Sequence, residues 1–418
     1  MSSIPPPSSP RPGPLGDLGK KLVPQTNSNA QVDVADLKRK SVRGGAVTML
    51  AQACSIIVHL VSTLVLARLL SPDDYGVVAM VLAVTGFAGL FRDLGLSSAA
   101  IQKKDLTHAQ QSNLFWLNIA MGVFLTLIVS AASPLVGLFY QKPELVSVTC
   151  AMSASFIIGA VGTQHGALLV RKMQFGRQAI ANISGAIVTL LVAITFSLQG
   201  YSYWSLVWGS LAGAFVTTCL LYLLSPFSPG RPSKGSGIRG MLQFGANITG
   251  FEFVNYFHRN LDNILIGRFW GPDALGLYTE AYRLLMLPIS AIRAPINTVA
   301  FPALSRLLEH PEAYRSYYRR VTAVVAFLSM PLCALLFATS RPAIEFLLGK
   351  QWLGVAPIFS WLAVTGFIQP VAGLRGLVML SNQHGKAYLY WGIFNAIFVS
   401  IGFGGFNFEV QESDVKVS

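Results

Sequence analysis

The longest stretch of this sequence without Asp, Glu, Lys or Arg lies at residues 178–230 and reads QAIANISGAIVTLLVAITFSLQGYSYWSLVWGSLAGAFVTTCLLYLLSPFSPG. Its 53 residues are too many for one membrane-crossing helix, because about 20 apolar residues already cross the hydrocarbon layer of a bilayer. The segment 199–202, QGYS, places turn-forming residues near the middle. The stretch therefore predicts two consecutive membrane-spanning helices.

The composition of the whole chain points the same way. The 418 residues are 53% hydrophobic and only 12% charged, with a mean hydropathy of +0.54, whereas soluble domains carry about a quarter charged residues. Further charge-free stretches occur at residues 44–67, 106–141, 145–170, 321–340, 351–374 and 387–408. A transmembrane helix forms all its backbone hydrogen bonds within itself, as the hydrocarbon layer requires. The stretches also lack the alternation of apolar and polar residues that marks the strands of about 10 residues in a membrane barrel. We therefore expect an all-α polytopic membrane protein.

Eleven transmembrane helices can be placed once the more polar spans are included. They lie at residues 45–67, 77–96, 113–136, 146–170, 178–198, 203–224, 241–267, 274–304, 321–340, 354–380 and 387–405. The domains that follow are a disordered, basic and proline-rich cytoplasmic tail at 1–43, a six-helix lobe at 44–225, a cytoplasmic linker at 226–240, a five-helix lobe at 241–405 and a polar tail at 406–418.

The formal net charge of +13 reports the topology of the chain in the membrane. The tail before the first span holds Arg11, Lys20, Lys21, Lys38, Arg39, Lys40 and Arg43, and alternate loops add Lys103, Lys104, Arg171, Lys172, Arg177, Arg231, Lys234, Arg239, Arg306, Arg315, Arg319, Arg320 and Lys386. The opposite loops offer mainly Lys142, Arg341 and Lys350. Basic residues gather on the cytoplasmic side of inner-membrane proteins. The asymmetry predicts a cytoplasmic N-terminus and excludes a nucleic-acid partner as the reason for the charge.

An internal repeat organises the chain. Four residues of the segment 67–76, Arg68, Pro72, Asp73 and Gly76, recur 200 positions later as Arg268, Pro272, Asp273 and Gly276. Proline and glycine favour tight turns, and arginine can extend to the lipid head groups. Each copy of this turn motif is therefore expected to turn the chain between two helices.

The same offset relates the helices that precede the two motifs. Gln52, Ser55, His59, Ser62 and Thr63 follow a spacing that lines one face of a helix. Their counterparts are Glu252, Asn255, Arg259, Asp262 and Asn263. An even number of spans separates the copies, so both have the same orientation. We therefore expect two lobes related by a pseudo-two-fold axis along the membrane normal, with a central cavity between them, as in transporters built from parallel repeats.

Charged residues inside the expected spans are the candidates for a substrate or ion pathway. They are Arg92 and Asp93 in the second span, Glu252, Arg259 and Asp262 in the seventh, and Glu280, Arg283 and Arg293 in the eighth. Each costs about 2.5 to 3.5 kcal/mol at the centre of a bilayer, so these groups should face one another or a wet cavity. Two interpretations are open for them. The acids and arginines form ion pairs that lock helices together, or the arginines bind phosphate, whose oxygens match the donor fork of a guanidinium. Alternatively, Glu252 and Asp262 bind the proton or Na⁺ that drives transport. Asn255 and Asn263 either form hydrogen bonds with sugar hydroxyls or hold neighbouring helices together.

Three segments resemble the bacterial polysaccharide transporters, the Wzx-type flippases of O-antigen and exopolysaccharide. They are the turn motif continued to Met80, the run Phe91-Arg-Asp-Leu-Gly-Leu96 with Ala99-Ala-Ile-Gln102, and the second-lobe run 267–278 with Phe301-Pro-Ala-Leu-Ser305. The resemblance covers about residues 40–405 and implies membership of the superfamily of multidrug exporters and lipid II flippases. It also implies an incomplete second lobe, because family members usually have more than eleven helices.

By this resemblance, the substrate is an undecaprenyl-diphosphate-linked oligosaccharide, moved from the cytoplasmic to the periplasmic leaflet of the inner membrane by alternating access. Glycosyltransferases, a polysaccharide polymerase and a chain-length regulator would act beside it, within membrane lipid. No enzymatic step and no cofactor apart from a coupling ion are expected. A multidrug or organic-cation antiporter is the alternative, although such a pocket would favour acidic and aromatic groups over arginines. A membrane polymerase or ligase is disfavoured, because the longest outward loop, about 341–353, is too short for a catalytic site.

The predicted topology can be tested with reporter fusions. A reporter placed within residues 231–239 should be active only as a cytoplasmic fusion, and one within 341–350 only as a fusion outside the membrane. The reversed pattern would contradict the cytoplasmic N-terminus.

Overall fold

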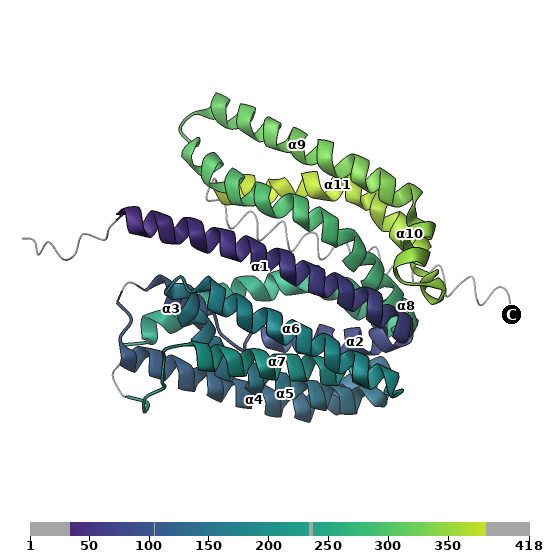
Figure 1. Cartoon of the computed structure of the whole chain (residues 1–418), viewed down its shortest axis with the longest axis horizontal. Helices are drawn as coiled ribbons and strands as arrows, with labels where there is room; N and C mark the ends of the chain where they lie inside the picture. Colours follow the sequence, from purple (N-terminus) through teal and green to yellow (C-terminus); the bar gives the residue numbers. More distant parts are fainter. Residues whose placement is uncertain (1–33, 104, 234–236, 382–418) are drawn as a thin grey trace, which may run out of the picture.

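The computed structural model describes residues 34–103, 105–233 and 237–381, and within these residues every regular element is a helix. Figure 1 shows α2 to α7 gathered in one group and α9 to α11 in another, with α1 and α8 between them. The expected eleventh span at 387–405, the polar tail at 406–418 and residues 1–33 of the expected N-terminal tail lie outside the described residues. The prediction that the disordered tail extends to residue 43 was wrong, because residues 34–43 form the start of α1. The fold is therefore the expected all-α polytopic one.

The helices are bounded as follows. The first half has α1 (Val34–Leu69), α2 (Pro72–Gly89), α3 (Leu96–Gln102), α4 (His108–Tyr140), α5 (Glu144–Arg171), α6 (Phe175–Leu198) and α7 (Trp204–Leu224). The second half has α8 (Arg239–Arg306), α9 (Pro311–Ala338), α10 (Ser340–Leu347), a short 3₁₀ turn η2 (Lys350–Trp352) and α11 (Val355–Ser381).

Seven helices of the described residues are long and apolar enough to cross a membrane. They lie in α1, α4, α5, α6, α7, α9 and α11. The more polar spans expected at 77–96, 241–267 and 274–304 correspond to α2 and to the two halves of α8, which are not among these seven helices.

The long apolar stretch that opened the sequence folds as two helices, as predicted. The chain turns between α6 and α7 at Gly200, whose φ of 83° is a conformation that favours glycine. The two helices then approach closely at small residues. A Cβ added to Gly185 would lie 1.8 Å from Thr217 Oγ1, and one added to Gly213 would lie 1.8 Å from Thr189 Oγ1. Small residues let helix backbones approach in membranes, where packing replaces the hydrophobic effect.

The second helix ends earlier than expected. It was predicted to continue to residue 96, but α2 stops at Gly89 and the chain turns before α3. Leu94 and Gly95 adopt positive φ angles of 46° and 65°. The carboxylate of Asp93 accepts hydrogen bonds from the backbone N–H and the hydroxyl of Ser97, which satisfy the first turn of α3. Arg92 and Asp93 therefore lie in this turn and not inside a membrane helix.

The two copies of the turn motif do turn the chain, but not at the expected glycines. In the first copy Ser71 and Asp74 form a capping box at the start of α2. In the second, Gly271 has φ 83° and ψ −177° and divides α8 into a first arm, 239–270, and a second arm, 272–306. Gly76 and Gly276 lie inside the helices that follow, so the expectation that they make the turn was wrong.

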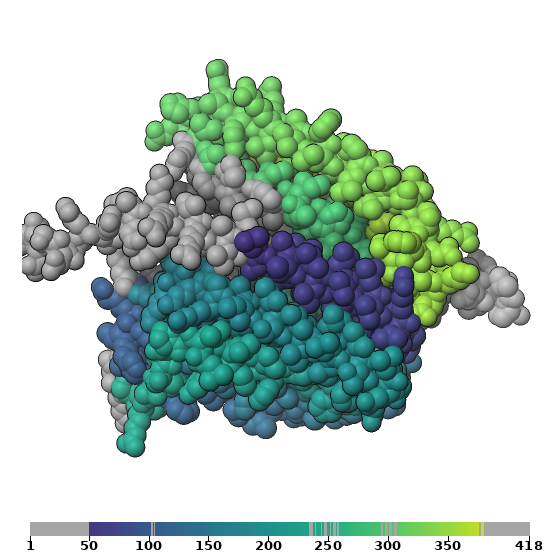
Figure 2. Space-filling view, in the orientation of Figure 1, coloured from purple at the N-terminus to yellow at the C-terminus, as the bar shows by residue number. Residues whose placement is uncertain are grey.

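The C-terminal end of α1 packs against the second half of the chain. Leu66, Ala67 and Leu70 share a buried cluster with Trp352. The indole of Trp352 donates a hydrogen bond to the carbonyl of Ala67 at 2.6 Å, and the amide of Gln351 donates to that of Leu70 at 3.2 Å. The last carbonyls of a helix have no partner within it, so these contacts complete α1. Figure 2 shows α1 in purple lying against the yellow-green atoms around residue 350.

We expect Trp352→Ala to destabilise the fold, because Trp352 is fully buried and the change leaves a large cavity. The expected cost is about 3 kcal/mol, measured as a lower melting temperature of the purified protein in detergent. Trp361→Ala is the matched control, since Trp361 is 75% exposed on the outer surface of α11, and it should melt as the wild type does. Equal melting of all three proteins would contradict the role of Trp352.

Candidate functional site

A polar cavity of about 260 Å³ lies between the end of α2 and the two arms of α8. Three residues predicted from the polar stripe line it, namely Glu252, Arg259 and Asn263. The remaining lining comes from Leu90, Tyr256, Asn260 and Tyr282. The cavity therefore combines an acid, a guanidinium, two amides and two phenols, while Leu90 adds an apolar wall.

The wall formed by α2 and the first arm is held by an aromatic cluster. The hydroxyl of Tyr256 donates a hydrogen bond to the carbonyl of Ala83. Phe87 contacts the rings of both Phe253 and Tyr256, with centroid distances of 5.5 Å and 6.0 Å. A Cβ on Gly86 would lie only 2.8 Å from the Tyr256 hydroxyl. Gly86 thus makes room for the tyrosine, whose position gives the cavity one side of its shape.

Asp262 ties the two arms of α8 together. Its carboxylate accepts a hydrogen bond of 2.7 Å from the hydroxyl of Tyr278, across the bend at Gly271. Tyr278 in turn stacks on Tyr282, with ring centroids 6.2 Å apart. Because Tyr282 lines the cavity, the bond from Tyr278 to Asp262 joins the two arms beside the cavity.

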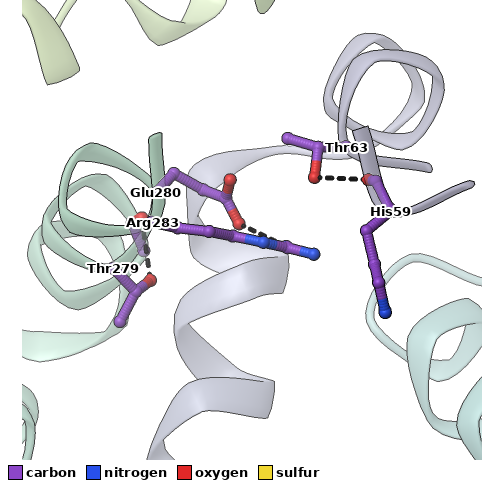
Figure 3. Close-up of polar contacts among 6 residues, drawn as sticks. His59, Thr63, Thr279, Glu280 and Arg283 are labelled. Carbon is purple, nitrogen blue, oxygen red and sulfur yellow. Dashed lines mark hydrogen bonds and ion pairs between the residues drawn. The ribbon is translucent and has the colours of Figure 1, made fainter. Parts of the chain in front are cut away.

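An ion pair of a buried glutamate and a partly exposed arginine faces α1 from the second arm. Glu280 is only 2% exposed, and its Oε1 lies 3.2 Å from Nη1 of Arg283. Its other oxygen, Oε2, is buried without a hydrogen-bond partner among the described residues. Figure 3 shows the Arg283 guanidinium extending from beside Glu280 toward His59 of α1. Glu280 therefore holds the Arg283 guanidinium on the face of the second arm that lies toward α1.

Several predicted pathway residues lie away from the cavity. The guanidinium of Arg92 packs over Gly159 of α5, where a Cβ would lie 2.9 Å from Nη1. Arg293 packs over Gly373 of α11 in the same manner. Asp93 caps α3, and burial raises the pKa of its carboxyl while the hydrogen bonds from Ser97 lower it. The side chain of Asn255 lies outside the described part of the structure.

The sequence reasoning missed Tyr256, Asn260 and Tyr282. Tyr256 lies four positions after Glu252 and three before Arg259, and Asn260 lies three before Asn263, so the helical spacing that found the stripe places both residues on the same face. Tyr282 comes from the other arm, and only the bend at Gly271 brings it to this face. Within the described residues, no three His, Cys, Asp or Glu side chains gather as a metal site.

A double-mutant cycle tests whether Glu280 and Arg283 stabilise the fold as a pair. Glu280→Gln and Arg283→Gln should each lower the melting temperature, and the double variant should lose less than their sum. The expected coupling is about 1 kcal/mol, since the Arg283 side chain is 41% exposed and partly screened. The pair Lys142 and Glu144, 3.6 Å apart, is the control, because its carboxylate is 33% exposed whereas that of Glu280 is 3% exposed, and it should show coupling near zero. Strictly additive losses at Glu280 and Arg283 would contradict the pairing.

The chain matches the family model described as polysaccharide biosynthesis protein over residues 65–357. It is similar to the teichuronic acid biosynthesis protein TuaB of Bacillus subtilis, with 29% identity over 85% of this chain and 74% of the relative. The chain is also similar to the lipopolysaccharide biosynthesis protein WzxC of Escherichia coli, with 24% identity over 83% of this chain and 71% of the relative. The succinoglycan biosynthesis transport protein ExoT of Rhizobium meliloti is 26% identical over 80% of this chain and 67% of the relative.

Two solved structures share the fold. An inward-facing multidrug resistance transporter of the MATE family superposes with a TM-score of 0.66 at 14% identity, over 83% of this chain and 86% of its own. The lipid II flippase MurJ superposes with a TM-score of 0.61 at 13% identity, over 87% of this chain and 99% of its own. These likenesses show that the chain has the fold shared by MATE transporters and MurJ. The match to the family model over residues 65–357 shows that the chain belongs to the polysaccharide biosynthesis protein family, the Wzx-type membrane transporters.

Proposed function

We propose that this protein is a flippase for lipid-linked oligosaccharides. It moves an undecaprenyl-diphosphate-linked repeat unit across the bacterial inner membrane by alternating access, with its N-terminus in the cytoplasm. The observation that carries the proposal is the cavity between α2 and the arms of α8, in a member of a polysaccharide transporter family. Glycosyltransferases, a polymerase and a chain-length regulator are the partners that would make and use such a substrate.

The groups around the cavity suit the two polar parts of that substrate. Arg259 offers a fork of N–H donors that matches phosphate oxygens. Asn260 and Asn263 both donate and accept hydrogen bonds, as sugar hydroxyls require. The phenols of Tyr256 and Tyr282 provide an apolar ring with a polar tip, which can pack on a sugar ring while bonding its edge. The polyprenyl chain stays in lipid.

Arg283 serves as a second anion-binding group in this proposal. The exposed part of its side chain extends toward α1, while Glu280 holds its guanidinium from behind. An anion that reached Arg283 would meet a cation already oriented, which lowers the cost of binding. The driving ion is a proton or Na⁺ held by an acid of the first arm, and Glu252 is favoured because it lines the cavity.

Replacing Arg259 tests the proposed function. The purified protein in liposomes should move a fluorescent lipid-linked oligosaccharide between leaflets, followed by loss of the label's accessibility to a membrane-impermeant quencher. Arg259→Ala should slow this movement about tenfold or more, because a charge-assisted hydrogen bond contributes about 1.5 to 3 kcal/mol, and Arg259→Lys should retain part of it. Arg315→Ala is the control, since Arg315 is an exposed arginine in the first turns of α9.

Three outcomes of this assay contradict the proposal. Wild-type rates in Arg259→Ala would remove Arg259 from substrate binding. Longer glycans in the liposomes would identify a polymerase. Movement of lipophilic cations in place of the lipid-linked sugar would identify a multidrug exporter.

A further inference from the structure

The segment that follows α7 has a proline at every third position. We name it the proline strap, residues 225–233, with the sequence SPFSPGRPS and prolines at 226, 229 and 232. A proline fixes its own φ near about −65° and restricts the residue before it to extended conformations. Six of the nine residues are thus held extended by the sequence alone. Ser225 accordingly has φ −85° and ψ 132°, which is close to the polyproline II helix.

The contacts between the strap and the first lobe recur at the same interval of three. The ring of Phe227 lies 5.3 Å from that of His165 in α5. The backbone N–H and C=O of Gly230 each form a hydrogen bond of 2.9 Å with a side chain of α4. Those of Ser233 bond the side-chain amide of Asn113, at 2.9 Å and 2.7 Å. A polyproline II helix has three residues per turn, so these contacts place one edge of the strap on the lobe.

The other two edges of the strap are open. A polyproline II helix forms no hydrogen bonds within itself, so its carbonyls remain accessible to a partner. Figure 1 shows the teal connection after α7 at the end of the group formed by α2 to α7. Residues exposed on the open edges are Pro226, Ser228, Arg231 and Pro232, and Pro229 is partly exposed. The strap therefore presents a ridge of prolines with a positive charge at one end.

We propose that the proline strap is a docking site for a cytoplasmic protein that has an aromatic-lined groove with an acidic group at its end. Grooves of this kind bind polyproline II segments with the pattern Pro-x-x-Pro, which Pro226 and Pro229 form. Arg231 follows two positions later, where its guanidinium suits a carboxylate of the partner. The basic residues of the chain predict this side to be cytoplasmic.

The role of the docking rests on the proposed function. A lipid-linked oligosaccharide that crosses the membrane outward must be completed on the cytoplasmic side. A glycosyltransferase held at the strap would release its product beside the transporter, which raises the local concentration of substrate. The strap itself contributes no group to the polar cavity.

The chemistry of the strap favours a protein partner over the surface of the bilayer. Segments that bind anionic membranes carry several Lys or Arg and bulky apolar side chains. Arg231 is the only charged residue in the sequence of the strap. Its one bulky apolar side chain, Phe227, is 6% exposed and packs inside the lobe. What the strap exposes is thus prolines and one arginine, which match a groove and not a lipid surface.

The attachment to the lobe lowers the cost of binding. A free proline-rich segment samples several conformations, and binding must select one of them. The strap is already extended and fixed along one edge by Phe227, Gly230 and Ser233. A partner therefore meets a ligand whose shape is set before contact.

The first experiment tests whether the strap is presented as a polyproline ligand. The probe is a purified SH3 domain that selects Pro-x-x-Pro-x-Arg, titrated onto the full-length protein in nanodiscs that contain anionic lipid. Binding is expected. Arg231→Ala should weaken it about tenfold or more through loss of a charge-assisted hydrogen bond, and Pro229→Ala about fivefold through loss of the preset backbone. Pro143→Ala, at an exposed proline before α5, is the matched control and should bind like the parent.

Three results of this titration overturn the docking site. The parent protein fails to bind the SH3 domain in either detergent or nanodiscs, which shows that the strap is not an accessible ligand. Binding occurs in detergent but not in nanodiscs, which shows that the strap lies against the membrane. All variants bind equally, which shows that the SH3 domain contacts another part of the protein.

The second experiment compares cells with liposomes. In cells, Arg231→Ala should lower polysaccharide export severalfold at an unchanged protein level, because the partner no longer docks, and Arg231→Lys should restore part of it. In liposomes the lipid-linked oligosaccharide is supplied directly, so Arg231→Ala should move it at the parent rate. Equal loss in both settings would make the strap part of the transport machinery, and full export in cells would show that no partner uses it. Either result overturns the docking site.

The docking site and the proposed function fail in different ways. If the parent protein moves no lipid-linked oligosaccharide in liposomes, but the SH3 domain binds and export in cells depends on Arg231, the proposed function fails and the docking site stands. If movement in liposomes is normal and Arg231→Ala exports as the parent does, the docking site fails and the proposed function stands.

Discussion

The relative placement of the two halves depends on a backbone contact that only glycine permits. Where α2 and the second arm of α8 cross, Gly76 and Gly276 each lie against the carbonyl of the proline that begins the other helix. Farther along α2, Gly86 accommodates Tyr256 of the first arm of α8, and beyond the end of α2 Leu94 lies against Gly245 of the same arm. α2 and the first arm therefore run side by side, and the cavity forms where Leu90 of α2 meets the polar face of that arm.

The cost of polar groups in hydrocarbon explains how the charged residues are distributed. Glu280 is buried and holds Arg283, and Asp262 accepts a hydrogen bond from Tyr278. Both contacts satisfy groups that would otherwise be costly in lipid. Glu252 and Arg259 instead line a cavity. An ion pair is thus present at Glu280 and Arg283, whereas the binding of phosphate by the arginines stays a prediction.

The repeat was visible in the sequence, but the sequence did not show which residues of each copy turn the chain and which contact the other copy. The offset of 200 residues identified Arg68, Pro72, Asp73 and Gly76 as a unit with their counterparts. Proline and glycine in a short segment favoured a turn, and the chain does turn at Ser71 and Gly271. Gly76 and Gly276 serve a different purpose, since they lie within helices and face each other. A glycine required by a distant backbone has the same local sequence signal as a glycine in a turn.

The sequence by itself determined the elements that depend on local composition. Apolar stretches long enough for a bilayer specify α4 to α7, α9 and α11, and the helical spacing from Glu252 to Asn263 specifies one polar face of α8. Only the tertiary structure decided which polar groups meet. Tyr282 joins Arg259 because α8 bends at Gly271, and Arg92 and Arg293 leave the cavity because Gly159 and Gly373 offer space on neighbouring helices. The reason is physical: hydrophobicity and helical period act along the chain, whereas the meeting of two faces depends on contacts between residues far apart in it.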